Sequence, residues 1–555
     1  MKSLKILTIS ALILFSITYL NSQPLPAKTY GGQNSERANT LVQTLDDNGY
    51  VLGGWTKSFG PGTPGFSNVL FVKTDSAGSV QGAKISIGDH DDEAYSMINT
   101  MDGGYAATGW TKSYGIGTPQ FSNIFVLKLD AQGNLQWSRV YGGMDDDQAY
   151  SIIQTHDLGY AVVGWTKSFG PPPYPNILVM KLDPLGFIQW SKVYYNTPQH
   201  AEDEGYDIVE INHPDTMFKY AVVGRAKITT PNNFDAYALI LDRNGNAGPV
   251  TTFLGEAEEE AYSVVWDGTG IVVAGWTNSF GPGSPNFANI FVLKSLLPIG
   301  VIWKIVYGWP DNDEKCLDDQ SLIQTLDGGY AVSGWTKSFG PGIPNPNFLI
   351  TKLNPMGGFQ WARVHPSVPG AQFDEAYPMI HTYFGGYAIA GWTNSFGLGM
   401  DDFHFLTLDP LGNRPVCVLE TEPPFDTLFY YLPTEMEQYE FRPELDSMPI
   451  IDTIVEETEI CPMVNLKNPP TQKPFKAKTE IQLKGNLVEL NLANNSEINL
   501  AIFDVSGRYI KTLVKGFFNA GTHQLSLPKA IEPGIYFLNL EIDGSRNSTA
   551  KFIKF

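Results

Sequence analysis

Clusters of acidic residues recur along the chain and are the first side chains that could do chemistry. Each cluster precedes a short apolar segment, as Asp89–Glu93 and Asp145–Asp147 do. Carboxylates grouped with backbone carbonyl oxygens suit hard cations such as calcium, which makes Asp91, Asp92, Asp145, Asp146 and Asp147 weak calcium candidates. None of the clusters has the spacing of a dedicated calcium loop. A structural interpretation is simpler: the carboxylates cap strands and pair with nearby lysines.

Tryptophans recur next to these clusters and could bind sugars or peptides through their ring faces. They stand in a phrase of the form GWT-Lys/Asn-S-Phe/Tyr-G, at Trp55, Trp110, Trp165, Trp276, Trp335 and Trp392. Packing between equivalent neighbouring units explains the same repetition. The sequence favours this structural role for the six tryptophans.

Other catalytic constellations are missing from the sequence. The eight histidines form no HExxH motif and the three cysteines form no CxxC motif, so little is available to build a transition-metal site. A quinone-dependent dehydrogenase commonly has adjacent cysteines and a sialidase needs an arginine cluster, and neither is present. The sequence therefore predicts a protein that is not an enzyme and has no cofactor, with calcium as the one alternative.

A repeat of about 55 residues organises most of the chain. The phrase around the tryptophans returns seven times, counting a degenerate copy in which Arg225 replaces the tryptophan. Successive copies are separated by 55, 55, 60, 51, 59 and 57 residues. A fixed period of this length is the signature of a repeat architecture.

Each copy contains four short apolar segments separated by turn residues. In the third copy they are 149–155, 160–166, 177–182 and 188–194. Four strands of this kind make one antiparallel sheet, and seven such sheets predict an all-β, seven-bladed β-propeller over residues 26–416. A solenoid is the alternative, but its repeats are usually shorter and lack this hairpin pattern.

The ends of the repeat region predict how the ring closes. Residues 26–32 (PAKTYGG) match the end of a fourth strand, for example WSRVYGG at 137–143, yet they precede the first complete repeat. We therefore expect residues 26–32 to be the outer strand of the seventh blade, where they remove a free sheet edge.

Two further features of the repeats are predicted to be local. Aspartate or asparagine in the last hairpin turn of a blade precedes a glycine by three residues, which favours a turn in which the side chain accepts backbone N–H bonds. These residues are Asp75, Asp130, Asp183, Asp242, Asn354 and Asp409. The fourth copy departs from the others at Arg225, His213 and Asp215 and has a short loop at 229–233.

Residues 1–22 read as a secretory signal peptide. Lys2 and Lys5 precede an apolar stretch that ends at Leu20, and this stretch is short for a membrane span. We expect a soluble, exported protein without a membrane span after cleavage. The net charge of −21 argues against a nucleic-acid partner.

Residues 417–475 read as an acidic, proline-containing connector. Between Cys417 and Cys461 it holds 12 acidic residues and one basic residue, Arg442. An exported protein can form disulfides, so Cys417 and Cys461 are a possible disulfide, and Cys316 is expected to be buried in the sixth blade.

The last residues, 476–555, are predicted to form a small immunoglobulin-like β-sandwich of seven strands. From residue 466 onward the chain carries a net charge of +5, opposite in sign to the acidic region before it. This contrast indicates a separately functioning module.

The C-terminal module resembles the type A sorting domain of the type IX secretion system. The matching residues are LAIFDVSGRYIKTL at 500–513, LPKAIEPGIYFLNLEIDG at 527–544 and KFIKF at 551–555. The resemblance implies translocation across an outer membrane by the secretion machinery. The repeats resemble the GGY…GWT.SFG…KLD repeats of secreted bacterial and archaeal proteins, a resemblance that implies architecture and no activity.

Together these features predict an exported protein, secreted or held at the outer cell surface, that acts as a binding or structural module. Its ligand is expected to be an extracellular glycan or protein. The alternative is a secreted carbohydrate-active hydrolase or lyase that uses the top face of the propeller, the face with the acidic clusters and the GWT loops.

Overall fold

The computed structural model describes residues 27–413 and, beyond them, twelve separate strands between residues 419 and 554. Short gaps interrupt the first part at 87, 197–201, 213–216, 229–232, 254, 298–299, 339–343, 366–372, 384, 396 and 398–399. The predicted signal peptide, His213, Asp215, Cys417 and Cys461 lie outside the described residues. Among the residues that are described, no helix is long and apolar enough to cross a membrane.

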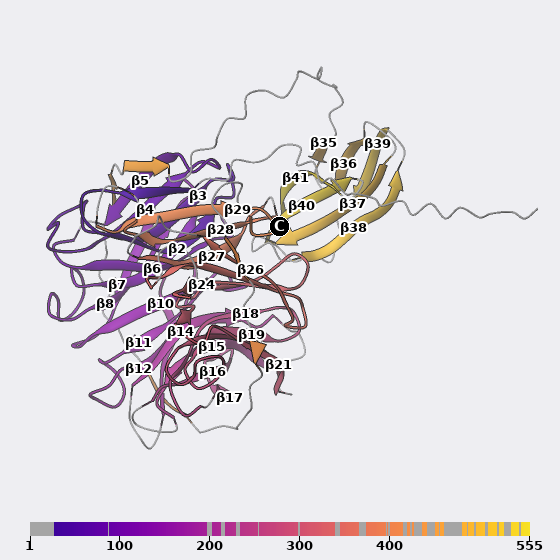
Figure 1. Ribbon diagram of the computed structural model, residues 1–555. Coiled ribbons are helices and arrows are strands. Elements are labelled where there is room, and N and C mark those ends of the chain that lie inside the picture. Colours follow the sequence, from indigo (N-terminus) through magenta and orange to yellow (C-terminus); the bar gives the residue numbers. More distant parts are fainter. Residues whose placement is uncertain are drawn as a thin grey trace, which may run out of the picture.

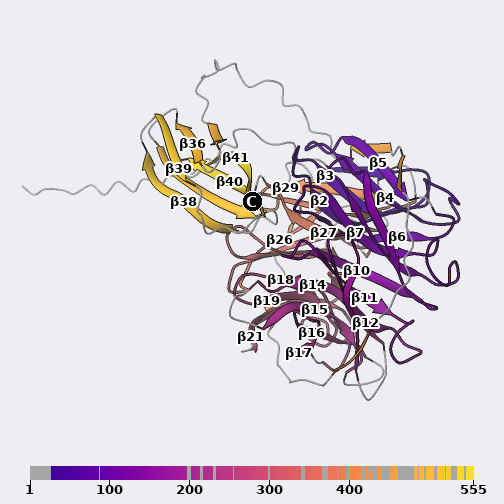
Figure 2. The same cartoon turned by 180° about the vertical axis from the view of Figure 1, so that it is seen from behind.

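Residues 27–408 form seven antiparallel sheets arranged as a ring, which confirms the predicted seven-bladed β-propeller (Figures 1 and 2). Each blade has four strands in chain order, numbered here from the inner strand outward. Blades 1 to 3 are β2 (Glu36–Gln43), β3 (Tyr50–Thr56), β4 (Asn68–Thr74), β5 (Val80–Ser86); β6 (Asp92–Asn99), β7 (Tyr105–Thr111), β8 (Asn123–Leu129), β9 (Leu135–Tyr141); and β10 (Asp147–Gln154), β11 (Tyr160–Thr166), β12 (Asn176–Leu182), β13 (Ile188–Asn196).

The other four blades repeat this plan. Blades 4 and 5 are β14 (Asp203–Glu210), β15 (Phe218–Ala226), β16 (Asp235–Asp242), β17 (Ala247–Phe253) and β18 (Glu259–Trp266), β19 (Ile271–Thr277), β20 (Asn289–Leu296), β21 (Gly300–Tyr307). In blade 6 the inner strand is split into β22 (Glu314–Lys315) and β23 (Leu322–Gln324), followed by β24 (Tyr330–Thr336), β25 (Asn347–Leu353) and β26 (Phe359–His365). Blade 7 is β27 (Asp374–His381), β28 (Tyr387–Thr393), β29 (Asp402–Leu408) and β1 (Ala27–Gly31).

The apolar core of the propeller lies between blades. Side chains on the facing surfaces of neighbouring blades form one cluster per interface, as Leu127 and Val140 of blade 2 do with Val42 and Phe71 of blade 1. The third strand of blade 3, β12, is buried at every position, because it is covered on both faces. This double burial explains why such strands are continuous apolar runs in the sequence.

The ring closes as the sequence predicted. β1 pairs antiparallel with β29, with Ala27 opposite Leu406 and Tyr30 opposite Phe403. Tyr30 is fully buried in the cluster between blades 7 and 1. The first described strand therefore completes the last blade.

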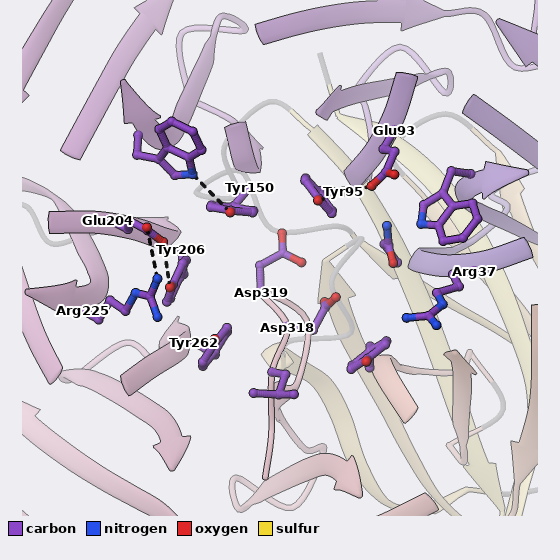
Figure 3. A pocket seen from close by; sticks show the side chains of 15 residues that line it. Arg37, Glu93, Tyr95, Tyr150, Glu204, Tyr206, Arg225, Tyr262, Asp318 and Asp319 are labelled. Atoms are coloured by element: carbon purple, nitrogen blue, oxygen red, sulfur yellow. Dashed lines mark hydrogen bonds and ion pairs between the residues drawn. The ribbon is translucent and has the colours of Figure 1, made fainter. Parts of the chain in front are cut away.

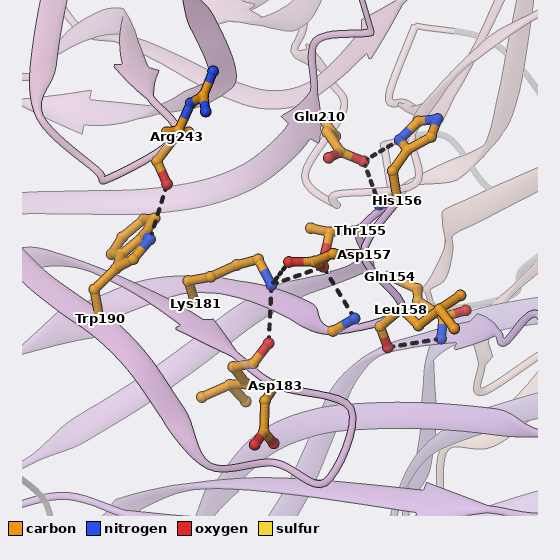
Figure 4. Close-up of polar contacts among 12 residues, drawn as sticks. Gln154, Thr155, His156, Asp157, Leu158, Lys181, Asp183, Trp190, Glu210 and Arg243 are labelled. Atoms are coloured by element: carbon orange, nitrogen blue, oxygen red, sulfur yellow. Dashed lines mark hydrogen bonds and ion pairs between the residues drawn. The ribbon is translucent and has the colours of Figure 1, made fainter.

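The blades have two different ends. The loops between second and third strands and the connections between blades lie at one end, which we call the loop end, and both hairpin turns lie at the other, the turn end. At the turn end the predicted aspartate turns are confirmed: Asp183 accepts bonds from the N–H groups of Leu185 and Phe187, both at 2.9 Å. A buried lysine of the third strand also reaches the turn between the first two strands, as Lys181 reaches Asp157 at 3.0 Å (Figure 4).

Five short strands between residues 419 and 459 lie on the outer edges of the blades. β30 (Leu419–Thr421), β31 (Phe425–Asp426), β32 (Met436–Glu440), β33 (Ile450–Thr453) and β34 (Glu456–Glu459) pair antiparallel with the outer strands of blades 6, 5, 3, 1 and 7, in this order. Figure 1 shows the orange strand β33 beside β5. The acidic connector thus follows the circumference of the ring and adds a fifth strand to five blades.

The register of these strands matches opposite charges. Four acidic residues of the connector lie directly opposite a basic residue of an outer strand: Glu420 opposite Arg363, Glu440 opposite Lys192, Asp452 opposite Lys84 and Glu459 opposite Lys28. Directly opposed unlike charges stabilise an antiparallel pair by roughly 0.2–1 kcal/mol each. Blade 4, where Thr251 occupies the corresponding position of the outer strand, receives no connector strand.

Seven strands form the C-terminal module: β35 (Glu480–Lys484), β36 (Leu487–Leu492), β37 (Ser496–Asp504), β38 (Tyr509–Phe518), β39 (Gly521–Ser526), β40 (Gly534–Ile542) and β41 (Ser545–Lys554). They form a sheet of β35, β36 and β39 and a sheet of β38, β37, β40 and β41. Val488 and Leu525 of the first sheet pack with Ile498, Leu500 and Leu538 of the second. As predicted, β40 and β41 are neighbours, with Gly534 opposite Lys554.

We predict that the charge match holds the connector strands against the ring. In the variant Glu420→Gln, Glu440→Gln, Asp452→Asn and Glu459→Gln, the amides of β30 and of β32–β34 should exchange roughly tenfold faster, because each lost pair removes part of the docking free energy. Hydrogen exchange followed by mass spectrometry measures this. The matched control, Asp426→Asn, Glu437→Gln, Glu456→Gln and Glu457→Gln, removes the same charge from connector residues that face no basic residue. Equal exchange in the two variants would contradict the prediction.

Candidate functional site: a pocket on the axis of the ring

The inner strands of the blades begin at the loop end, and the side chains of their first residues surround a pocket on the axis. The pocket has a volume of about 560 Å³, within the range of small-molecule sites, ~300–1,000 Å³. Its walls come from blades 1 to 5 and blade 7, and part of its lining comes from residues 317–319 of blade 6. The lining residues are Arg37, Asn39, Trp55, Glu93, Tyr95, Tyr150, Trp165, Glu204, Tyr206, Arg225, Tyr262, Leu317, Asp318, Asp319 and Tyr377.

A β-bulge places the tyrosines in this pocket. In blade 3, Ala149 pairs with Gly164 and Ser151 pairs with Val163, so Tyr150 is the extra residue between them. The register shifts at the corresponding place at Tyr95, Tyr206 and Tyr262, and at Asn39 in blade 1. A bulge changes the direction of the side chain it carries, and here that residue lines the pocket.

The bulge also explains the glycine that precedes the tryptophan in every repeat. A Cβ atom on Gly164 would lie 2.0 Å from the carbonyl oxygen of Gln148 in the bulged strand. The same carbonyl approaches the equivalent glycine in all seven blades, at 1.9–2.3 Å for Gly54, Gly109, Gly224, Gly275, Gly334 and Gly391. No other residue fits there, so the bulge depends on glycine.

The tyrosine rings form a continuous arc. The ring centroids of Tyr95 and Tyr150 are 5.1 Å apart, those of Tyr150 and Tyr206 are 5.3 Å apart, and Tyr206 stacks on Tyr262 at 4.5 Å. Their hydroxyl groups donate to glutamates two residues earlier, Tyr206 to Glu204 at 2.9 Å and Tyr262 to Glu260 at 2.7 Å. Tyr150 follows Gln148 in place of a glutamate, and its hydroxyl accepts from Trp165 at 3.1 Å.

Two arginines stand among these carboxylates. Arg225, which replaces the repeat tryptophan in blade 4, donates to Glu204 at 3.1 Å and to Glu260 of blade 5 at 2.9 Å. Arg37 donates to Asp401 at 3.1 and 3.2 Å, and its guanidinium lies 3.9 Å from the ring centroid of Trp392. Both arginines therefore connect neighbouring blades at the pocket rim.

An insertion in blade 6 fills the axis below the pocket. Lys315 and Leu322 hold the registers that Gln148 and Ile152 hold in blade 3, yet six residues lie between them instead of three. Gln320 in this insertion donates to the carbonyl of Met97 at 3.1 Å and accepts from the N–H of Leu41 at 3.1 Å. We call residues 316–321 the plug, because they cross the axis and bond to blades on its far side.

The plug brings three carboxyl groups together near the pocket floor. Figure 3 shows Asp318 and Asp319 between the tyrosines on one side and Arg37 on the other. Burial and the charge of Asp319 raise the pKa of Asp318, whose carboxyl is hydrogen-bonded to that of Asp319. Burial raises the pKa of Asp319 to about 6, and burial with the nearby Asp319 raises that of Asp207. Asp318 and Asp319 can therefore share a proton near neutral pH.

Glu93 is the other pocket carboxylate with a displaced pKa. Burial, followed by the charge of Asp91, raises its pKa to about 7. Its oxygens accept from the hydroxyl groups of Ser67 and Tyr95, both at 3.3 Å. Neither donor carries a charge.

The predicted calcium residues are used in hydrogen bonds within and between blades. Asp147 accepts from the hydroxyl groups of Thr166 and Ser168, and Asp92 does the same with Thr111 and Ser113. Asp91 and Asp146 accept from the N–H and hydroxyl groups of Ser67 and Ser122, and Asp145 accepts from the N–H of Asp146. Within the described part of the chain, no three His, Cys, Asp or Glu side chains lie together as a metal site requires.

The repeat tryptophans divide between the pocket and the contacts between blades. Trp55 and Trp165 line the pocket, and Trp110, Trp165 and Trp392 donate to the hydroxyl of a tyrosine in their own blade at 3.1–3.3 Å. Lys315 of blade 6 lies 3.4 Å from the ring centroid of Trp276, and Trp335 is buried in the same blade as Lys315. Cys316 is buried and free in blade 6, as expected.

Sequence reasoning found the tryptophans and the acidic clusters but missed the tyrosines and the plug. The signal was present: Ala-Tyr-Ser recurs at 94–96, 149–151 and 261–263, always at the start of an inner strand. A residue that breaks strand alternation at the same place in successive repeats indicates a bulge. The extra residues of blade 6, LDDQ at 317–320, were a second signal.

Comparison with protein families identifies the C-terminal module. The family model for a secretion system C-terminal sorting domain matches residues 474–554, which confirms the predicted type IX sorting domain. The protein is therefore secreted by this system and is attached to the cell surface or released. The comparison with curated proteins finds no match to the chain.

Buried carboxylates make the stability of the propeller depend on pH. Burial raises the pKa of Asp92 and Asp147 to about 6 and of Glu259 and Glu314 to about 7, above the ordinary value of about 4 in an unfolded chain. The folded protein then binds more protons than the unfolded chain between pH 4 and 7. Its stability falls as the pH rises through this interval.

We predict a melting temperature several degrees higher at pH 5 than at pH 8, measured by calorimetry of the purified protein. Asp147→Asn should reduce this difference by roughly one group's share. The control is Asp157→Asn: burial would raise the pKa of Asp157, but Thr155 and Lys181 hold it below its ordinary value, so this group does not titrate between pH 5 and 8. A melting temperature that rises with pH over this interval would contradict the prediction.

The sorting module should depend on its last strand. β41 pairs with β40 along its whole length, so deleting residues 546–555 leaves β40 as an open edge and removes one strand of the folded surface. We predict that the truncated protein stays in the periplasm of a type IX-competent bacterium while the full-length protein appears outside, as judged by immunoblots of cell fractions. Equal release of the two forms would show that export does not require this strand.

Proposed function

We propose that this exported protein is an extracellular binding protein whose propeller takes its ligand in the pocket on the axis. The observation that carries the proposal is the lining of the pocket: tyrosines from five blades and Trp55 and Trp165 supply ring faces, and carboxyl groups stand between them. Apolar ring faces with a few well-placed polar groups are typical of ligand sites. The plug supports this, because it gives the pocket a floor.

The sorting module and the pocket divide the work between export and binding. The C-terminal strands carry the signal that the secretion machinery recognises, and the propeller is the passenger. Its ligand is then met outside the cell, as a glycan or as part of a protein. Trp55 is the residue best placed to stack on such a ligand, because it lines the pocket and remains partly exposed.

A carbohydrate-active hydrolase or lyase is the second proposal for the same pocket. It is favoured by the carboxyl pair Asp318–Asp319, because glycoside hydrolysis uses two carboxyl groups about 5–10 Å apart. Against it, these two side chains are hydrogen-bonded to each other. No space is left between them for a scissile bond, and for this reason we prefer binding over catalysis.

The binding proposal is tested on glycan and protein arrays with the purified propeller. We predict that Trp55→Ala lowers the signal on every bound spot at least tenfold, because the variant loses a stacking face. The matched control is Trp137→Ala: Trp137 lies on the outer strand β9 and packs on Tyr160, away from the pocket.

Two results would count against binding in the pocket. Equal loss in both variants would place the binding surface elsewhere or reflect a loss of folding, which melting curves identify. Release of shorter products from an array glycan, detected by mass spectrometry and abolished by Asp319→Asn, would support the hydrolase instead.

A further inference from the structure

The charges around the pocket do not balance. Four lining residues are acidic, Glu93, Glu204, Asp318 and Asp319, and two are basic, Arg37 and Arg225. Arg225 is shared by Glu204 and by Glu260, which stands just behind the lining, and Arg37 is paired with Asp401. Neither cation is therefore available to Glu93 or to the aspartate pair. The pocket stays negative even when Asp318 and Asp319 share one proton.

Glu93 is a pocket carboxylate without an ion pair. Its hydrogen bonds come from the neutral hydroxyl groups of Ser67 and Tyr95, and within the described residues no lysine or arginine nitrogen lies within 4 Å of it. Lys57 attracts it only from a greater distance, while Asp91 repels it. A carboxylate that burial has partly stripped of water gains most from a cation placed against it.

The walls of the pocket suit a cation of a particular kind. Ring faces attract positive charge, with an attraction of roughly 0.5–2 kcal/mol per well-placed ring, and the arc from Tyr95 to Tyr262 presents several rings side by side. A bare metal ion would instead need three or more converging ligands, which the described residues do not supply. A cavity of about 560 Å³ also leaves room for an organic group that carries the charge.

We propose that the pocket binds an organic cation, a ligand with an ammonium or guanidinium group, held by Glu93 and the Asp318–Asp319 pair and enclosed by the tyrosine rings. The proposal rests on the function proposed above, that the pocket binds a ligand, and adds the charge of that ligand. An amino sugar and a lysine or arginine side chain of a peptide are two sources of the same chemistry.

The experiment compares matched ligands that differ only in charge. Isothermal titration calorimetry of the purified exported protein uses a glucosamine tetramer against its N-acetylated form, and a lysine-containing peptide against the same peptide with acetyl-lysine. We expect the charged member of at least one pair to bind at least tenfold more tightly than its neutral partner. Which pair shows the difference identifies the source of the cation.

Charge-removing variants locate the binding. Glu93→Gln keeps the shape of the side chain and should weaken binding of the charged ligand roughly tenfold while leaving binding of the neutral ligand unchanged. Asp318→Asn, in the plug, should act in the same direction. The control is Glu256→Gln, which removes the same charge from an exposed residue outside the pocket lining. This control matters because the whole protein carries a charge of −21 and attracts cations at long range.

The outcomes separate this inference from the proposed function. If the neutral ligands bind as tightly as the charged ones and Trp55→Ala removes both, the pocket binds a ligand but the inference is wrong. If Glu93→Gln and Glu256→Gln weaken the charged ligand equally, the attraction comes from the surface and the inference is also wrong. If no ligand of either kind binds and the arrays are blank, both the inference and the proposed function fail.

Discussion

The structure depends on the hydrogen bonds that join β1 to β29. They close the ring, and only a closed ring gives every blade two neighbours against which to bury its faces. The seven apolar clusters, one for each pair of adjacent blades, exist because of this closure. It also fixes the number of inner strands around the axis, and seven inner strands leave a space there that side chains of ordinary length must either fill or surround.

The protein meets this constraint in two ways. The bulge in the inner strands adds a residue at the axis, a tyrosine in most blades, and the glycine of the adjacent strand makes room for the bulged backbone. The three extra residues of blade 6 then block the axis, with Gln320 bonded to blades 1 and 2. Space left by the symmetry of the ring thus becomes a pocket closed at one end, because one blade departs from that symmetry.

The repeats made the scaffold predictable, and the departures from them made the site hard to predict. Trp55 and its equivalents mark the blade number, and residues 26–32 mark the closure, because a period and a misplaced fragment are visible in the letters alone. The direction of Tyr150 depends on a register shift between two strands, which no single segment reveals. The connector strands were missed for another reason: β34 (EETE) has no apolar alternation, and it pairs through its backbone and opposite a lysine.

The departures from the repeat are concentrated at the axis. At the residue after the capping carboxylate, where other blades have Glu or Gln, blade 1 has Arg37 and blade 6 has Lys315; blade 4 has Arg225 in place of tryptophan, and Asp207 in place of a serine or threonine. Asp207 still does the work of that hydroxyl, because it accepts the N–H of Val264 in the next blade at 2.7 Å, as Thr40 accepts that of Met97 at 2.8 Å.

Random drift would spread such changes over loops and outer strands as well. Here the changed residues are fitted to one another: Arg225 neutralises glutamates of two blades, and Asp207 faces the carboxyl groups of the plug. The turn end, in contrast, keeps the same aspartate turn in blades 1 to 4, 6 and 7, with asparagine in blade 6. A scaffold that is uniform at one end and individual at the axis of the other has the distribution of differences that a binding site requires, because a small ligand presents a different group to each blade.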